Sequence, residues 1–251
     1  PKEGKDMLVD IALQGPMSRD ILLSLAEPAE QRKIRRINRN QLTASVVAGI
    51  DVIVSRTGYT GEKMAFELFV HPNDAVRFWN ALMEAGTPLG MVLVGLGARD
   101  SLRTEAGLPL YGHEMGGEMN LTIGEAGFLP FLKLNSAWFI GREAFVKREA
   151  KRTGVVARFT FDEKAVRMAH PGDPVCDLKG RMIGKVTSCA IDSNGYLTGQ
   201  AFVDKKAAVE GTRIFIFQNA PNWRQNPPAQ LTAGDRVALP GAATIVSRYM
   251  K

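Results

Sequence analysis

The chain has 251 residues, 45% of them hydrophobic and 23% charged, which is typical of globular domains and excludes a disordered, collagen-like or coiled-coil protein. Its 32 Lys and Arg residues outnumber its 26 Asp and Glu residues, and the net charge of +6 favours anionic partners such as a polycarboxylate or nucleic acid. The two cysteines, Cys176 and Cys189, exclude a framework of several disulfides and favour a reducing, cytoplasmic compartment.

The first part of the chain predicts a mixture of strands and helices, because β-branched runs alternate with segments of helical periodicity. The expected elements are a strand over residues 7–15, a short helix after it, a hairpin over residues 41–55, a strand over residues 66–70 and an amphipathic helix over residues 73–86.

Residues 31–40 concentrate five cations with two isoleucines among them: Arg32, Lys33, Arg35, Arg36 and Arg39. This pattern has two interpretations. The segment is either an anion-binding edge or a solvated surface segment.

A helix is predicted to run from Arg99 to Glu105, after an apolar run at residues 91–98. That run is far shorter than the roughly 20 residues that a membrane-spanning helix needs. Arg99, Leu102 and Arg103 fall on one face of the helix, so two guanidinium groups share a stripe. A buried arginine needs a paired anion, so an acidic partner is expected nearby.

The pattern changes after Thr153 to short strands separated by turn residues, and we place a domain boundary there. Residues 154–251 are expected to form a small antiparallel β-barrel, which makes the fold class α+β. The expected strands cover residues 155–160, 174–176, 182–188, 197–203, 212–217, 236–239 and 244–249, with a long Pro-rich loop at 218–241.

The common catalytic signatures are absent from the sequence, including a nucleophile elbow, a phosphate-binding loop and a zinc-binding His-Glu-x-x-His motif. The three histidines, His71, His113 and His170, are widely spaced and predict no metal site. Chemistry must therefore be sought in less common motifs.

Several blocks of residues, in order along the chain, resemble the glycine-cleavage T-protein family of tetrahydrofolate-dependent aminomethyltransferases. The blocks that carry the resemblance are Ser55-Arg56-Thr57-Gly58-Tyr59-Thr60-Gly61-Glu62 with Phe66-Glu67, Gly97-Ala98-Arg99-Asp100-Ser101-Leu102-Arg103, Glu105-Ala106-Gly107, Leu110-Tyr111-Gly112-His113, Glu125-Ala126-Gly127, Phe139-Ile140-Gly141-Arg142-Glu143, His170-Pro171-Gly172-Asp173-Pro174-Val175 and Ile183-Gly184-Lys185-Val186-Thr187-Ser188.

The resemblance implies a T-protein-like folate-binding domain over residues 1–153, followed by the C-terminal barrel over residues 154–251. It also implies cofactor-binding roles: Glu67 matches the family's pterin-binding carboxylate, Arg99 the arginine of its Gly-x-Arg-Asp block, and Tyr59 the aromatic residue lining the pocket. For Glu67 and Arg99 the structural alternatives are a solvent-facing strand residue and an ion pair that holds the helix. For Tyr59 the alternative is a simple turn residue.

The chain is expected to lack the family's N-terminal third, which carries the catalytic aspartate, so no catalytic residue is assigned. The basic residue that ends the family's last strand matches either Arg248 or Lys251. The resemblance implies a one-carbon transferase that uses tetrahydrofolate and a lipoyl carrier protein as partner, and it leaves open the one-carbon donor and the oligomeric state.

Two alternatives remain. The chain could be a demethylase relative or a non-catalytic folate-binding protein that acts in assembly or regulation. Nucleic-acid binding through residues 31–40 and the barrel is disfavoured, because the chain lacks the interleaved aromatic residues that single-strand binding favours.

Overall fold

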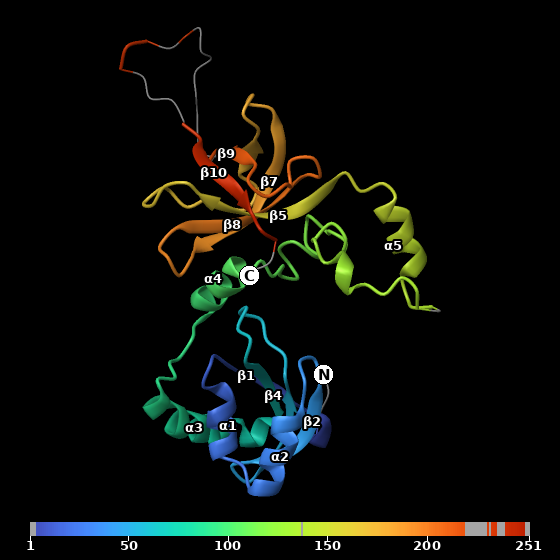
Figure 1. The fold of residues 1–251 in the computed structure, drawn as a ribbon, viewed down its shortest axis with the longest axis vertical. Helices are drawn as coiled ribbons and strands as arrows, with labels where there is room; N and C mark the ends of the chain where they lie inside the picture. Colours follow the sequence, from blue (N-terminus) through green and yellow to red (C-terminus); the bar gives the residue numbers. More distant parts are fainter. Residues whose placement is uncertain (1–3, 137, 219–229, 231, 235–238, 249–251) are drawn as a thin grey trace. The chain divides into compact units, whose positions relative to one another are not determined.

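The computed structural model describes residues 4–136, 138–218, 230, 232–234 and 239–248. The chain forms two compact units, one up to Arg99 and one from Asp100 onward (Figure 1). Residues 100–153 thus belong to the same unit as the barrel. The position after Thr153, where the sequence predicts a boundary, is where the first barrel strand begins, at Gly154. Among the described residues no helix is long and apolar enough to cross a membrane.

The first unit is a four-stranded antiparallel sheet with helices packed on one face. The strand order is β1-β4-β3-β2. The strands are β1 (Val9–Gln14), β2 (Leu42–Val47), β3 (Ile50–Ser55) and β4 (Ala65–Val70), and the helices are α1 (Ser18–Ser24), α2 (Pro28–Arg36) and α3 (Pro72–Gly86), with short 3₁₀ turns at Gly4–Asp6 and Thr87–Leu89.

The predicted hairpin between β2 and β3 is confirmed. Its two loop residues, Ala48 and Gly49, both have positive φ angles, 53° and 69°, while Val47 pairs with Ile50. A tight loop of this kind needs the left-handed conformation at both positions, and it matches the twist of the two strands.

Side-chain alternation along β4 separates the two faces of the sheet. Phe66, Leu68 and Val70 are fully buried in the core beneath the helices, whereas Glu67 and Phe69 are only partly buried. Successive strand residues point to opposite faces, so Glu67 lies on the face that does not carry this core.

The cationic segment at residues 31–40 forms most of α2 and the turn after it. Ile34 and Ile37 are buried, whereas all five cations are exposed. Lys33 forms an ion pair with Glu30 at 2.7 Å. The geometry is that of an amphipathic surface helix.

The second unit contains helices and loops that lead into a closed barrel of strand order β10-β5-β8-β7-β6-β9. Its elements are α4 (Leu96–Glu105, which begins in the first unit), a 3₁₀ turn (Leu129–Phe131), α5 (Arg142–Glu149), β5 (Gly154–Phe161), β6 (Pro174–Cys176), β7 (Met182–Ile191), β8 (Leu197–Asp204), β9 (Arg213–Ile216) and β10 (Gly241–Val246). The predicted α+β fold with an antiparallel barrel is confirmed. The strand predicted at 236–239 falls almost wholly outside the described residues.

The barrel is filled by alternate side chains of its strands, as closure without a pore requires. Phe159 and Phe161 on β5 pack inside it edge to face, with ring centroids 5.6 Å apart. A β-bulge interrupts β7 between Val186 and Ser188. Bulges redirect side chains, and this one turns two hydroxyl groups toward the same buried carboxylate, as described below.

Candidate functional site

Glu67 occupies the sheet face opposite the hydrophobic core, between two small neighbours. It pairs with Ala12 on β1 and with Ser55 on β3. Because both of these neighbours have small side chains, they do not cover the carboxylate from the sides. Strand alternation alone accounts for its position, and its surroundings then decide what it can contact.

A short chain of hydroxyl groups orients this carboxylate. Thr57 donates a hydrogen bond from Oγ1 to Glu67 Oε2, and the Ser55 and Thr57 hydroxyl oxygens lie 2.9 Å apart. No hydrogen bond from a described residue reaches Glu67 Oε1. The carboxylate is therefore fixed on one side and available to a ligand on the other.

Asp10 on β1 shares this environment, at a position diagonal to Glu67. Partial burial raises the pKa of Asp10, and the negative charge of Glu67 raises it further. Arg99 and the backbone amide of Leu68 oppose these effects. Two carboxylates and one guanidinium thus influence one another on a single sheet face.

Arg99 and Tyr59 also come together in this unit. The guanidinium carbon of Arg99 lies 5.0 Å from the centroid of the Tyr59 ring, which is cation–π geometry. The backbone N–H of Tyr59 donates to Gln14 Oε1 at 3.2 Å, and the Thr60 hydroxyl donates to the same oxygen at 2.6 Å. Gln14 therefore anchors the loop that carries Tyr59.

The structure thus groups all three residues predicted from the sequence and adds Asp10 and Gln14. These two residues were missed, although the alternation of Val9-Asp10-Ile11-Ala12-Leu13-Gln14 carries the signal. In a strand that alternates in this way, the polar and small residues share one face.

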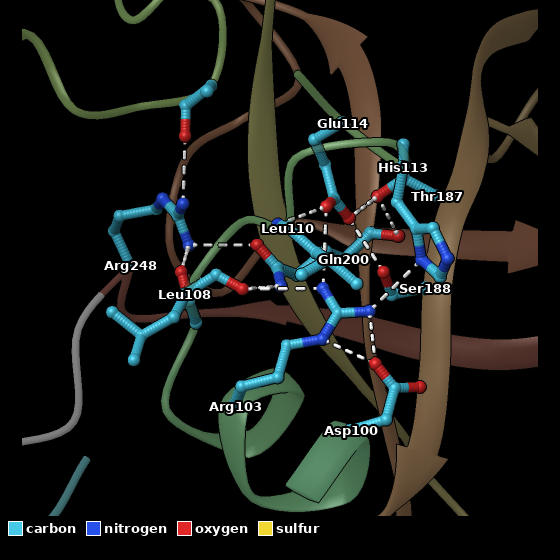
Figure 2. Close-up of polar contacts among 12 residues, drawn as sticks. Asp100, Arg103, Leu108, Leu110, His113, Glu114, Thr187, Ser188, Gln200 and Arg248 are labelled. Atoms are coloured by element: carbon cyan, nitrogen blue, oxygen red, sulfur yellow. Dashed lines mark hydrogen bonds and ion pairs between the residues drawn. The ribbon is translucent and has the colours of Figure 1, made fainter. Parts of the chain in front are cut away.

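A second polar centre lies within the second unit, where Arg103 of α4 and Glu114 point toward one another (Figure 2). Both side chains are buried, at 1% and 0% exposed. Arg103 Nη1 lies 3.3 Å from Glu114 Oε2, and Arg103 Nε donates to Asp100 Oδ1 at 2.6 Å. The acidic partner expected for a buried arginine on this helix is present.

Both oxygens of Glu114 are fully used. Oε2 also accepts the backbone N–H of Leu110 at 2.8 Å, and Oε1 accepts the hydroxyls of Thr187 and Ser188 at 2.7 and 2.6 Å (Figure 2). These hydroxyls come from the bulge in β7. With two donors on each oxygen, Glu114 has little capacity for a ligand, and its role is to hold the 108–114 segment against the barrel.

Arg248, which follows β10, joins the same network. Its guanidinium donates to the carbonyl of Gly107, to Ala126 O at 2.8 Å and to Gln200 Oε1 at 3.3 Å, and it lies 5.3 Å from the Phe128 ring centroid. Of the two basic residues considered for the end of the last strand, Arg248 is described and Lys251 lies outside the described residues.

No group of three or more His, Cys, Asp or Glu side chains that could hold a metal ion occurs in the part of the chain that the structure describes. The polar centres above consist of carboxylates, guanidinium groups, hydroxyls and amides, together with the imidazole of His113, whose Nδ1 lies 3.3 Å from Arg103 Nη2.

A comparison with family models matches residues 2–136 to the GCVT N-terminal domain, which is more than half of the chain. The chain belongs to the glycine-cleavage T-protein family. The resemblance seen in the motifs is confirmed.

Curated relatives and a solved structure agree with this membership. An aminomethyltransferase of Streptomyces avermitilis is 39% identical over 215 residues, covering 84% of this chain and 56% of the relative. An aminomethyltransferase of Koribacter versatilis is 41% identical over 188 residues, covering 73% of this chain and 47% of the relative. The chain therefore spans about half the length of these relatives.

The crystal structure of glycine cleavage system aminomethyltransferase T from Bartonella henselae is similar across nearly all of this chain. The TM-score is 0.74 at 25% sequence identity, and the match covers 97% of this chain and 61% of the other.

We predict that Glu67→Gln lowers the pKa of Asp10 toward the ordinary aspartate value, because the substitution removes a negative charge that raises it. A carbon-13 NMR titration of the Asp10 carboxyl measures this change. Glu62→Gln, at an exposed position in the preceding loop, is the matched control and should leave the pKa unchanged. An unaltered Asp10 pKa in Glu67→Gln would show that the two carboxylates do not interact.

Glu114→Gln is expected to destabilise the second unit by about 3–5 kcal/mol, the usual cost of removing one partner of a buried ion pair. Hydrogen exchange of the β7 and β8 amides measures the change in that unit. The control is Glu163→Gln at an exposed position. If these amides exchange equally slowly in both variants, the ion pair is not a main source of the unit's stability.

Proposed function

We propose that this chain contributes the folate-binding part of a tetrahydrofolate-dependent aminomethyl transferase, with Glu67 as the pterin-binding carboxylate. The observation that supports this proposal is that only one oxygen of the Glu67 carboxylate accepts a hydrogen bond from a described residue. Thr57 binds one oxygen, no described residue donates to the other, and small residues lie on both sides. Membership of the T-protein family agrees with it.

The chemistry of a pterin suits a carboxylate in this position. A pterin presents an N–H group and an amino group side by side, and a carboxylate can accept from both in a forked, charge-assisted arrangement. The hydroxyl of Thr57 restricts rotation of the Glu67 side chain, so less conformational entropy is lost when a ligand binds. A neutral amide would offer one acceptor only.

Arg99 supplies the complementary charge. Among the described residues it forms no ion pair, and its recorded contact is with the face of Tyr59. A guanidinium held by an aromatic ring remains free to bind a carboxylate or carbonyl of the ligand. Tyr59 would then position Arg99 beside the ligand.

In the proposed reaction, the carbon of an aminomethyl group on the lipoyl arm of a carrier protein forms bonds to two nitrogens of tetrahydrofolate, while its bonds to sulfur and to the amino nitrogen break. The two N–H protons of tetrahydrofolate pass to the departing sulfur and nitrogen, so the products are methylene-tetrahydrofolate, the dihydrolipoyl carrier and ammonia. The residues of this chain would bind and orient the folate, and catalysis by positioning can supply a large part of such a rate enhancement. We assign no catalytic residue. A cytoplasmic location is proposed because Cys176 and Cys189 are both free thiols.

The non-catalytic alternative uses the same site. A folate-binding protein that acts in assembly or regulation would keep Glu67, Arg99 and Tyr59, but it would not catalyse aminomethyl transfer. Turnover assays of the chain with aminomethylated carrier protein separate these two functions, whereas folate titration tests what they share.

Glu67→Ala is expected to weaken tetrahydrofolate binding roughly 10- to 150-fold, because hydrogen bonds to a charged group are worth about 1.5–3 kcal/mol. Titration calorimetry of the 251-residue chain measures the affinity. Asp51→Ala removes an exposed carboxylate on β3 of the same sheet and serves as control. Equal affinity of Glu67→Ala and the unmodified chain, or no binding by the unmodified chain, would contradict the assignment.

Arg99→Lys is expected to weaken the same binding about tenfold, because lysine keeps the positive charge but loses the planar fork and its stacking on Tyr59. The titration is repeated at low and high salt. A loss of affinity that persists at high salt indicates that the planar shape of the guanidinium group matters. Unchanged affinity would show that Arg99 contributes only its positive charge.

A further inference from the structure

A pocket of about 320 Å³ lies in the second unit, separate from the Glu67 region. Its walls come from residues 124–129, the start of β5 and the end of β10. Half of the lining residues are aliphatic, and the charged residues of the lining are Arg152, Arg158, Glu210 and Arg248. This volume falls at the lower end of the range for small-molecule sites, which are mostly apolar with few polar groups.

Arg158 on β5 is the unusual member of this set. It is 8% exposed, yet its one recorded hydrogen bond runs from Nη1 to the carbonyl of Ser247 at 2.8 Å. Its Nε is buried without a partner, and no carboxylate of the described residues forms an ion pair with it. Burial lowers the pKa of Arg158, and the more distant Glu105 and Asp192 only partly oppose this effect.

A comparison with Arg103 shows what Arg158 lacks. Arg103 is more deeply buried, at 1% exposed, but it has Asp100 and Glu114 as ionic partners. A buried guanidinium with no anion is costly, because desolvation is not repaid by an opposite charge. Among the described residues, the protein places a carboxylate within ion-pair distance of Arg103 but not of Arg158.

Arg158 also lies close to a second cation. A Cβ added at Gly107 would come within 2.5 Å of Arg158 Cδ and within 2.8 Å of Arg248 Nη1, so both side chains pass beside the same glycine. Two arginine side chains therefore lie close together in the pocket lining, and an anion beside them would be attracted to both.

Positive charge is in excess in the pocket lining, which has three arginines and one glutamate, and this excess favours an anionic ligand. Arg152 already pairs with Glu149 at 2.7 Å, so we assign the single negative charge of the ligand to Arg158. The aliphatic walls, which include Val156, Ile245 and Leu129, favour a ligand with an apolar body.

We propose that this pocket binds an organic monocarboxylate with an apolar body, and that Arg158 is its ionic partner. The carboxylate would accept from Nη2 of Arg158, which forms no hydrogen bond among the described residues, while the apolar body would contact the aliphatic wall. This inference does not rest on folate binding by Glu67, because every lining residue belongs to the second unit.

The test titrates the whole chain with sodium benzoate, with its neutral isostere benzamide and with inorganic phosphate, at constant ionic strength. Binding is measured from the Arg158 Nε–H signal in ¹H–¹⁵N NMR spectra and from the melting temperature. Benzoate is expected to shift the Arg158 signal and raise the melting temperature, and benzamide is expected to do neither. Phosphate should bind more weakly than benzoate, because it has no apolar body.

Arg158→Met should weaken benzoate binding about tenfold or more, and Arg158→Lys should weaken it less. The control Arg181→Met removes an exposed arginine that pairs with Asp177, and it should bind benzoate normally. If Arg158→Met does not fold, the comparison of Arg158→Lys with the unmodified chain takes its place.

Three results would overturn the proposal: equal binding of benzamide and benzoate, tighter binding of phosphate than of benzoate, or unchanged benzoate affinity in the Arg158 variants. Glu67→Ala should leave benzoate binding unaltered, so failure of the folate site and failure of this pocket give different results.

Discussion

The buried ion pair between Arg103 and Glu114 is the interaction on which the second unit depends. It joins α4 to the bulged strand β7, and hydrogen bonds extend from it through the carbonyl of Leu108 and the side chain of Gln200 to Arg248 (Figure 2). Because such a pair is stable only when its remaining donors and acceptors are satisfied, each added bond contributes to holding the segment against the barrel.

The charged side chains of this protein differ in how many of their hydrogen-bonding positions are occupied. Fully bonded side chains hold the structure together, whereas incompletely bonded ones are candidates for ligand binding. Glu114 accepts two donors on each oxygen, whereas Glu67 keeps one oxygen open. Arg103 has two ionic partners, whereas Arg158 has none among the described residues. A buried or half-buried charge that the protein leaves incompletely paired is a candidate for pairing by a ligand.

The two candidate sites differ in how they relate to the family. The Glu67 face, for which we propose folate binding, includes residues from the motifs that resemble the glycine-cleavage T-protein family. The Arg158 pocket uses a residue outside those motifs, and its walls suit a smaller apolar anion. Each unit therefore carries its own electrostatic feature: an open carboxylate beside Arg99 in the first, an unpaired guanidinium in the second.

The sequence by itself determined the local elements, the α+β class and the family, because hairpin residues such as Ala48 and Gly49, strand alternation and ordered motifs depend on neighbours along the chain. Alternation also predicts that Arg158 faces outward from the barrel, beside inward-facing Ala157 and Phe159. Only the tertiary structure decided that this outer surface is covered, since Val156 N donates to Glu125 O at 2.7 Å and brings the 124–129 segment over β5. Likewise Glu114 meets Thr187 and Ser188 across more than 70 positions of sequence. Such contacts depend on how distant segments pack, and no local pattern encodes them.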